Sequence, residues 1–196
     1  MKELVVATRN TGKLKEISRL LEGTVNALYS LAEFPELPAI IEDGDTFEQN
    51  ALKKARVTAL QVGKPVIADD SGLCVDALAG RPGIHSARFA GETANDEANN
   101  RRLLTELAGI PKEQRSASFH CVIALCFPDG SCHTFSGRLV GIILEKPKGI
   151  GGFGYDPLFF LSEYNQTLAE LPLDVKNRIS HRGTAFAKLK AHLLQE

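Results

Sequence analysis

Apolar runs of strand length alternate along this chain with segments whose apolar residues recur at helical spacing. The run at 4–7 predicts a buried strand, and Leu14, Ile17 and Leu20 after it share one face of a predicted amphipathic helix. Residues 24–29 predict a second strand. The chain is therefore expected to begin as a strand, a polar turn, a helix and another strand.

A further helix is predicted over residues 47–62. Thr46 and Gln49 form the sequence signature of a capping box, with threonine at the N-cap and glutamine three residues later. Small apolar residues recur every four positions along one face of this segment. Asn50 and Lys54 are also four residues apart, so both are expected to project from another face.

A buried strand is predicted at 66–70, where a short apolar run ends on two adjacent aspartates. Ser71-Gly72 is expected to turn the chain, and residues 73–75 to form a short hairpin partner. A charged helix is then expected from Asn95 or Asp96 to about Ala108.

Two long strands are predicted at 116–127 and 131–144. Pro128-Asp129-Gly130 between them is a clear hairpin signal. Because both strands are long, we expect their sheet to form much of the core. Residues 158–161 predict one more strand, and an apolar stripe containing Phe186, Leu189 and Leu193 predicts a closing helix.

Composition indicates one ordinary globular domain, which we expect to span residues 1–196. The chain is 43% hydrophobic and 24% charged, and no repeat or linker marks a boundary. The formal net charge of -1 provides no basic field, so nucleic acid and membranes are not expected partners. Without an apolar span or a signal peptide, the chain is expected to be cytoplasmic.

The four cysteines are expected to be structural thiols. They contain no Cys-x-x-Cys pair, and the spacing of His120-Cys121 and Cys132-His133 fits no usual zinc site. Cys121 and Cys126 lie within an apolar strand segment, where a free cysteine behaves as a small hydrophobic residue.

Asp69 and Asp70 are the strongest candidates for chemistry. Adjacent carboxylates at the end of a buried strand repel each other and lose hydration, so they need a cation or strong donors nearby. Oxygen ligands of this kind suit Mg²⁺, which proteins commonly hold with one or two carboxylates and substrate phosphates. From these residues alone, a polar loop between strands remains the alternative.

Residues 8–13, with the sequence Thr-Arg-Asn-Thr-Gly-Lys, connect the first strand to the first helix. The free N–H groups and the dipole of a helix N-terminus bind anions, and Lys13 adds a cation. The segment is not a Walker A loop, because Ala7 and Leu14 stand where that motif needs glycine and serine or threonine. A phosphate-binding turn of another type and a plain strand-to-helix connection both stay open.

Residues 149–154 formally contain Gly-x-Gly-x-x-Gly. A dinucleotide fingerprint is excluded because a strand, and not a helix, is predicted after them. The glycines permit close approach of the backbone to a ligand, and Phe153 or Tyr155 offers a ring for stacking a planar base. A flexible turn is the alternative.

Basic residues gather at the start of the closing helix. Ser180 is the expected N-cap, which places His181 and Arg182 in the first turn, where positive charge opposes the helix dipole. This arrangement makes sense where an anion or an electron-rich base edge binds.

Five motifs occur together and in order: Thr8–Lys13, Glu42–Phe47 with Asn50-Ala51, Asp69–Leu73, Gly151–Pro157 and Ser180–Arg182. In this combination the chain resembles the inosine triphosphate pyrophosphatases, also called non-canonical purine NTP pyrophosphatases, over essentially its whole length. The resemblance implies hydrolysis of ITP, dITP and XTP to the nucleoside monophosphate and pyrophosphate with Mg²⁺. It also implies a homodimer and an α/β fold, with a long mixed β-sheet flanked by helices and two lobes around a central active-site cleft.

The resemblance also assigns roles to individual residues. Phosphate binding is assigned to Thr8, Arg9, Asn10, Thr11, Gly12, Lys13 and Lys54. Glu42 and Asp70 would bind the metal, and Asp70 would also accept a proton. Ser71 would contact substrate, and the nucleotide pocket would contain Phe153, Gly154, Tyr155, Asp156, Lys176, His181 and Arg182. Many relatives carry two acids before the lysine where this chain has Asp174-Val175, a difference that affects the local loop and leaves Lys176 in place.

We therefore expect Asp70 with Mg²⁺ to activate water for attack at the α-phosphorus, while Lys13 and Lys54 stabilise the leaving pyrophosphate. A regulator that binds a purine nucleotide without hydrolysing it is the alternative from another functional class. Release of pyrophosphate from ITP distinguishes the two. A nucleic-acid-binding protein is disfavoured by the net charge of -1.

Overall fold

The computed structural model of the chain describes residues 3–195. Its helices and strands follow in chain order: β1 (Glu3–Val6), α1 (Thr11–Leu20), β2 (Ala27–Ser30), α2 (Phe47–Val62), β3 (Val66–Val75), α3 (Asp96–Glu106), β4 (Ser116–Cys126), β5 (Cys132–Ile143), β6 (Phe159–Leu161), β7 (Gln166–Thr167), α4 (Leu173–Ile179) and α5 (His181–Leu193). Short 3₁₀ helices lie at Leu31–Glu33, Asp76–Leu78, Gly83–Arg88 and Lys112–Gln114.

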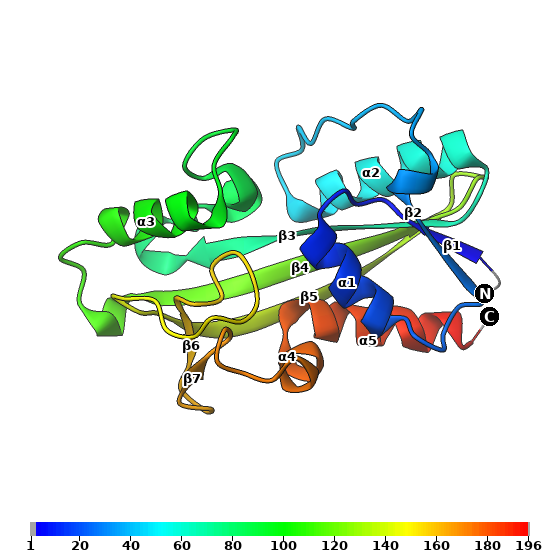
Figure 1. The fold of residues 1–196 in the computed structure, drawn as a ribbon. Coiled ribbons are helices and arrows are strands. Elements are labelled where there is room, and N and C mark those ends of the chain that lie inside the picture. Colours follow the sequence, from blue (N-terminus) through cyan, green and yellow to red (C-terminus); the bar gives the residue numbers. More distant parts are fainter. Residues whose placement is uncertain (1–2, 196) are drawn as a thin grey trace. The chain divides into compact units, whose positions relative to one another are not determined.

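The strands form a mixed sheet in the order β2-β1-β3-β4-β5-β6-β7 (Figure 1). β1 pairs in parallel with β2 and β3, and β6 pairs antiparallel with β5 and β7. The predicted α/β class, with a mixed sheet flanked by helices, is confirmed. The central cleft stays a prediction. Within residues 3–195, no helix is long and apolar enough to cross a membrane.

The chain divides into two compact units. Unit 1 contains Met1–Asp70, Cys121–Gly137 and Arg182–Glu196, and unit 2 contains Ser71–His120 and Arg138–His181. The division falls within β3, β4 and β5, because the first part of each strand belongs to one unit and the second part to the other.

The core of unit 1 has one cluster on each face of its part of the sheet. α1 and α5 cover one face, where Ile17 and Phe186 pack with Ile67 of β3. α2 covers the other face with Ala51, Ala55 and Ala59, which pack against alternate residues of the same strands (Figure 1). Successive side chains of a strand point to opposite faces, so one strand serves both clusters. The alanine stripe allows α2 to lie close to the sheet.

Unit 2 is organised around a separate apolar cluster. It joins the second half of β3, through Leu73 and Val75, to Leu103 of α3 and to Phe159 of β6. All four side chains are fully buried. This core supports the glycine-rich segment and α4 described below.

Side-chain caps explain where α1 and α2 begin. The side chain of Thr46 accepts a hydrogen bond from the Gln49 N–H at 3.1 Å, as the capping signature predicts. At the other end, Gly63 caps α2 in the left-handed conformation directly after Val62. Gln49 Oε1 accepts from the Asp45 N–H, one residue before the N-cap. Asn10 caps α1 by accepting from the Lys13 N–H at 2.9 Å.

The structure corrects the prediction of a turn at Ser71-Gly72. β3 runs without interruption from Val66 to Val75, and the expected hairpin partner 73–75 is the second half of the same strand. Leu73 and Val75 are buried in the core of unit 2. Burial of these side chains and continued pairing favour extended backbone over the turn that Ser-Gly favours locally.

The prediction of structural thiols is correct for Cys74 and Cys121, which are free, and wrong for Cys126 and Cys132. Cys126, at the end of β4, forms a disulfide with Cys132, at the start of β5. The hairpin at 128–130 is present as predicted and brings these two residues opposite each other. Their spacing in the sequence resembles no standard motif, so only the pairing of the strands identifies them as partners. The short helix α4 was also not predicted.

Candidate active site

Asp69 and Asp70 point to opposite faces of the sheet. Val66 and Ala68 of β3 pack against α2, whereas Ile67 packs with α1 and α5. Strand alternation therefore places Asp69 on the face of α1 and α5, and Asp70 on the face of α2. The two carboxylates are 3% and 5% exposed, so each depends on the partners that its own face provides.

Asp69 is held by two cations. Lys13 Nζ of α1 lies 3.0 Å from Asp69 Oδ2, and Arg182 Nη2 of α5 lies 3.5 Å from the same oxygen. The other terminal nitrogen of Arg182 forms a hydrogen bond and ion pair with Glu16 of α1. Arg182 is 3% exposed, and this buried network ties both helices to β3.

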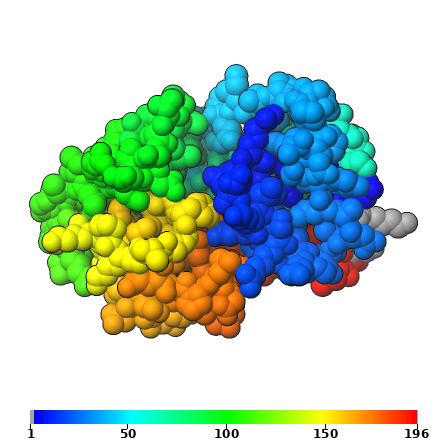
Figure 2. All heavy atoms as spheres, in the orientation of Figure 1, coloured from blue at the N-terminus to red at the C-terminus, as the bar shows by residue number. Residues whose placement is uncertain are grey.

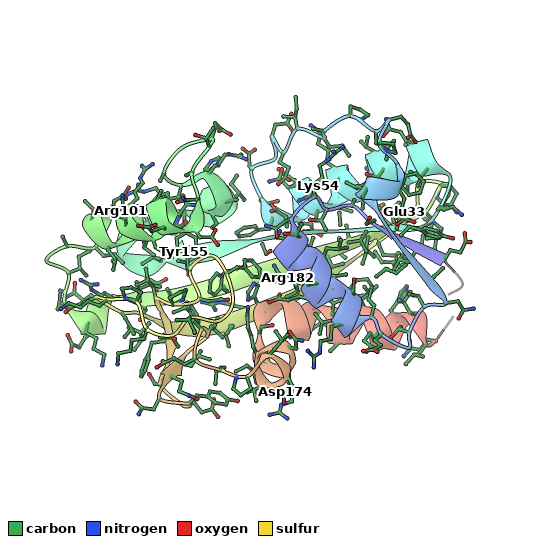
Figure 3. The ribbon with its side chains drawn as sticks, viewed as in Figure 1. Glu33, Lys54, Arg101, Tyr155, Asp174 and Arg182 are labelled. Atoms are coloured by element: carbon green, nitrogen blue, oxygen red, sulfur yellow. A yellow bond between two sulfur atoms is a disulfide. The ribbon has the colours of Figure 1, made fainter. Side chains whose placement is uncertain are left out.

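Asp70 meets a different set of partners. Asn50 Nδ2 of α2 donates to Asp70 Oδ2 at 3.1 Å, and Lys54 Nζ lies 3.9 Å from Asp70 Oδ1. Lys54 also lies 3.1 Å from Glu42 Oε1 and donates to the Asp69 carbonyl at 2.8 Å. Figure 3 labels Lys54 and Arg182, which come from helices on opposite faces of the sheet. Glu42 and Asp70, from separate segments, thus converge on one lysine.

The two neighbouring carboxylates have opposite pKa shifts. Burial alone raises the pKa of Asp69, but Lys13 and Arg182 outweigh it and hold that pKa well below its ordinary value. Burial raises the pKa of Asp70, and the attraction of Lys54 and Lys13 does not compensate. Glu42 adds to the rise because a second negative charge disfavours ionisation. Asp69 is therefore a fixed anion, whereas Asp70 binds a proton more readily.

The predicted phosphate-binding segment, residues 8–13, leads into the first turn of α1. Thr8 Oγ1 accepts from the Asn10 N–H at 3.2 Å, and Arg9 donates to the Leu37 carbonyl at 2.9 Å. Thr11 and Gly12 are the first residues of α1, where helix geometry offers their N–H groups no intrahelical acceptor. Lys13 follows them, so an anion at this end would meet N–H groups and an ammonium.

The carboxylate pair of Glu42 and Asp70 fits a hard divalent cation. Both side chains already direct an oxygen to the ammonium of Lys54, and carboxylate oxygens are the ligands that Mg²⁺ prefers. Within residues 3–195, no group of three or more His, Cys, Asp or Glu side chains is arranged to hold a metal. A pair of carboxylates agrees with an ion that completes its coordination with water and substrate oxygens.

In unit 2, Asp156 organises the predicted base-binding residues. Its Oδ2 accepts from Lys176 Nζ at 2.7 Å and from the Phe153 N–H at 2.9 Å. Lys176 is 3% exposed, and its Nζ lies 4.9 Å from the centroid of the Phe153 ring. A half-buried ring and a buried lysine therefore lie side by side.

The glycine-rich segment needs its glycines at particular positions. Gly152 has φ +72°, and a Cβ there would lie 2.0 Å from Asp156 Oδ2. Gly154 has φ +63° with open space around the position of a Cβ. In Figure 2 the yellow surface of this segment faces the viewer, in agreement with the exposure of Gly151 and Gly152.

The remaining predicted residues have varied surroundings. Tyr155 donates from its hydroxyl to the Ser86 carbonyl at 2.8 Å, and burial raises its pKa. His181 stacks on Phe119 with ring centroids 4.7 Å apart. Ser71 is half-buried in β3. His181 belongs to unit 2 and Arg182, the next residue, to unit 1.

Sequence reasoning missed Glu16 altogether, and it named Asn50 and Asp69 without predicting their partners. Glu16 pairs with Arg182, Asn50 orients Asp70, and Asp69 acts as the anchor of Lys13 rather than as a partner of Asp70. Strand alternation could have separated Asp69 from Asp70 in advance. No local pattern pairs Glu16 with Arg182, because 166 positions separate them in the chain.

The five sequence motifs belong to a chain that matches a known protein family along nearly all of its length. The model of the Ham1 family matches residues 4–192. The dITP/XTP pyrophosphatase of Geobacter sulfurreducens is 61% identical over 193 residues, which cover 98% of this chain and 97% of the relative. The chain belongs to the Ham1 family. The resemblance seen in the sequence is thereby confirmed.

Other Ham1 relatives agree. The dITP/XTP pyrophosphatase of Bacillus subtilis is 50% identical over 96% of both chains. Among solved structures, a HAM1 protein from Coxiella burnetii superposes with a TM-score of 0.91 at 41% identity and full coverage of both chains. The Ham1 protein of Staphylococcus aureus gives 0.89 at 40% identity, with 99% of each chain covered.

Proposed function

We propose that this chain hydrolyses the non-standard purine nucleoside triphosphates ITP, dITP and XTP to the nucleoside monophosphate and pyrophosphate, and so clears them from the nucleotide pool. The convergence of Glu42 and Asp70 on Lys54 carries this proposal. Phosphoryl chemistry requires carboxylates for a metal and a cation for phosphate in one place. Residues 1–196 act as a single catalytic domain.

The triphosphate is assigned to the lysines and the first turn of α1. Lys13 and Lys54 bind phosphate oxygens and stabilise the charge of the leaving pyrophosphate. Thr8, Arg9 and Asn10 line the turn, and the N–H groups of Thr11 and Gly12 donate to a phosphate. Support comes from the fixed position of Lys13, whose ammonium is 3.0 Å from the buried Asp69.

Glu42 and Asp70 are assigned as ligands of Mg²⁺. When bound, this ion neutralises phosphate charge and makes water more acidic. Asn50 holds Asp70 Oδ2, and Lys54 neutralises part of the charge of both carboxylates.

Asp70 accepts the proton of the water that attacks the α-phosphorus. Asp69 already pairs with Lys13 and Arg182, whereas Asp70 lies with Glu42 beside Lys54, the lysine assigned to phosphate, which favours Asp70 over Asp69 as the proton acceptor. Asp69 keeps its charge and serves to hold Lys13 and Arg182. The α–β anhydride breaks, and pyrophosphate leaves.

The purine base is assigned to unit 2 and to the start of α5. Phe153 stacks on the base, and Lys176 donates to its 6-keto oxygen, because Asp156 holds that lysine beside the ring. Gly154, Tyr155, Ser71, His181 and Arg182 complete the substrate-binding set. In ATP an amino group replaces the 6-keto oxygen, so two hydrogen-bond donors, this amino group and the buried Lys176, face each other without an acceptor. This mismatch weakens the binding of ATP.

The test is incubation of the chain with ITP and Mg²⁺ and measurement of pyrophosphate. We expect one pyrophosphate for each IMP formed, and kcat/KM for ATP lower by about 100-fold or more. Tight binding of ITP with no pyrophosphate would overturn the proposal and favour a regulator that senses the nucleotide.

We further propose a homodimer in the cytoplasm, where the nucleotide pool is found. The family resemblance supports the dimer. Sedimentation equilibrium tests it, and a monomer mass at micromolar concentration would contradict it. The net charge of -1 supports the expectation that neither nucleic acid nor a membrane is a partner.

A further inference from the structure

Gly154, in the middle of the glycine-rich segment, is held by two side chains of one helix. Its N–H donates to Asp96 Oδ2 at 2.7 Å, and its carbonyl accepts from Asn100 Nδ2 at 2.9 Å. Asp96 and Asn100 are four residues apart in α3, so they project from the same face, one turn from each other. In Figure 2 the green surface of α3 adjoins the yellow surface of the glycine-rich segment.

The two hydrogen bonds from α3 restrict the backbone of Gly154. Gly154 has φ +63°, and a Cβ at this position would meet no atom within 4 Å, so no neighbouring group restricts the backbone on the side where a side chain would lie. Glycine also has the widest conformational range of any residue. The two contacts from α3 occupy both polar groups of its peptide backbone.

The residue before Gly154 carries the stacking ring. The Phe153 N–H is held by Asp156 Oδ2 at 2.9 Å, and Lys176 Nζ lies 4.9 Å from the centroid of its ring. The Gly154 N–H, which donates to Asp96, belongs to the peptide group that links Phe153 to Gly154. Asp156 therefore fixes the backbone before the ring, and α3 fixes it after the ring.

We propose that Asp96 and Asn100 are positioning residues for recognition of the base: by clamping Gly154 they set the direction of the Phe153 ring. The inference rests on the proposed function, because it takes Phe153 as the surface on which the purine stacks. The hydrogen bonds from Asp96 and Asn100 contribute to binding of the nucleoside part of the substrate. They leave binding of its phosphate tail unchanged.

The variants Asn100→Ala and Asp96→Ala remove one contact each. Asp96→Asn keeps an acceptor oxygen for the Gly154 N–H and serves as the conservative rescue. Glu97 and Arg101 form an exposed ion pair with the same spacing, one residue further along α3, and Arg101 lies on its solvent-facing side (Figure 3). Glu97→Ala and Arg101→Ala are therefore matched controls for effects on the helix itself.

The readouts are kcat and KM for dITP with Mg²⁺, and the inhibition constant of inorganic tripolyphosphate, which has no base. In Asn100→Ala and Asp96→Ala we expect KM for dITP to rise about tenfold, as loss of one hydrogen bond predicts, with kcat within about twofold of wild type. The inhibition constant of tripolyphosphate stays the same. Asp96→Asn and both controls behave as wild type.

An unchanged KM in Asn100→Ala would overturn the inference. So would an equal rise in KM and in the tripolyphosphate constant, because a general structural effect weakens both. The dissociation constant of dITP, measured by calorimetry without a divalent ion, separates this result from failure of the proposed function. If the wild type binds dITP but releases no pyrophosphate, the proposed function fails. The proposal for Asp96 and Asn100 is then tested by whether their alanine variants bind dITP more weakly than the wild type. If the wild type does not bind dITP, both fail.

Discussion

At the scale of single residues, identical side chains next to each other in the chain acquire different chemistry. Asp69 and Asp70 are both buried, yet Lys13 and Arg182 hold the first as an anion while burial raises the pKa of the second. The difference arises because a strand directs consecutive side chains to opposite faces. The roles of the two carboxylates therefore follow from the helices that cover each face.

Replacement of Asp70 by Asn tests its assignment as proton acceptor. The amide keeps the shape of the carboxylate but cannot take up a proton, so we expect turnover of dITP to fall about 10³-fold while dITP still binds. Pyrophosphate release and titration calorimetry measure the two effects. Asp43→Asn is the control, because Asp43 is an exposed acid paired with Lys53. Turnover within tenfold of wild type in Asp70→Asn would refute the assignment.

The thiol of Cys121 predicts a loss of stability at alkaline pH. It is fully buried, and burial raises its pKa from 9.0 to about 12. Below pH 9 the thiol is protonated in both states and has no effect. Between pH 9 and 12 only the unfolded chain ionises it, so the free energy of unfolding falls by about 1.4 kcal/mol per pH unit.

Urea unfolding at pH 8 and pH 10.5 measures this loss. Cys121→Ala is expected to be less stable than the wild type at pH 8. Because the variant lacks the titrating thiol, the difference in unfolding free energy between the two proteins should be smaller at pH 10.5. A deficit that is the same at both pH values would contradict the prediction.

At the scale of elements, local signals predicted those helices and strands whose ends have their own caps or turns. α2 begins after Thr46 and ends at Val62 as expected, and the hairpin of β4 and β5 turns at 128–130. The prediction failed at Ser71-Gly72, where burial of Leu73 and Val75 continues β3. It also failed for Cys126, whose disulfide partner is set by strand pairing.

Gly152→Ala tests the conformation of the glycine-rich segment. The new Cβ would lie 2.0 Å from Asp156 Oδ2, so the carboxylate that holds Lys176 and the Phe153 N–H must move. We expect KM for dITP to rise by about tenfold or more, measured by steady-state kinetics. A KM equal to that of wild type would show that this geometry does not matter to binding.

Gly130→Ala is the matched control for this substitution. Gly130 lies in the hairpin turn with φ +89°, and a Cβ there meets nothing within 4 Å. The backbone strain alone should cost about 1 kcal/mol of unfolding free energy and leave KM unchanged.

At the scale of the whole molecule, the fold and the proposed metal site are energetically separable. The apolar clusters that hold the sheet consist of Leu, Ile, Val, Ala, Cys and aromatic side chains. Lys54 already neutralises part of the charge of Glu42 and Asp70. Folding is therefore expected to proceed without a divalent ion, whereas hydrolysis is not.

Chelation by EDTA should abolish pyrophosphate release and shift the Tm by less than about 4 °C, equivalent to roughly 1 kcal/mol or less in a domain of this size. Added Mg²⁺ should restore activity. Calorimetric scans and activity assays on the same samples measure both quantities. Full activity after exhaustive chelation would contradict the assignment of Glu42 and Asp70 as metal ligands.

The sequence by itself determined the family, the order of most elements and the candidates for chemistry, because caps, turns and motifs are local patterns that survive in a linear chain. Tertiary structure alone decided which charges meet. The pairing of Arg182 with Glu16, of Glu42 with Asp70 through Lys54, and of Gly154 with α3 joins residues far apart in the sequence. Such pairs depend on which elements pack on which face of a sheet, and that is a property of the folded chain.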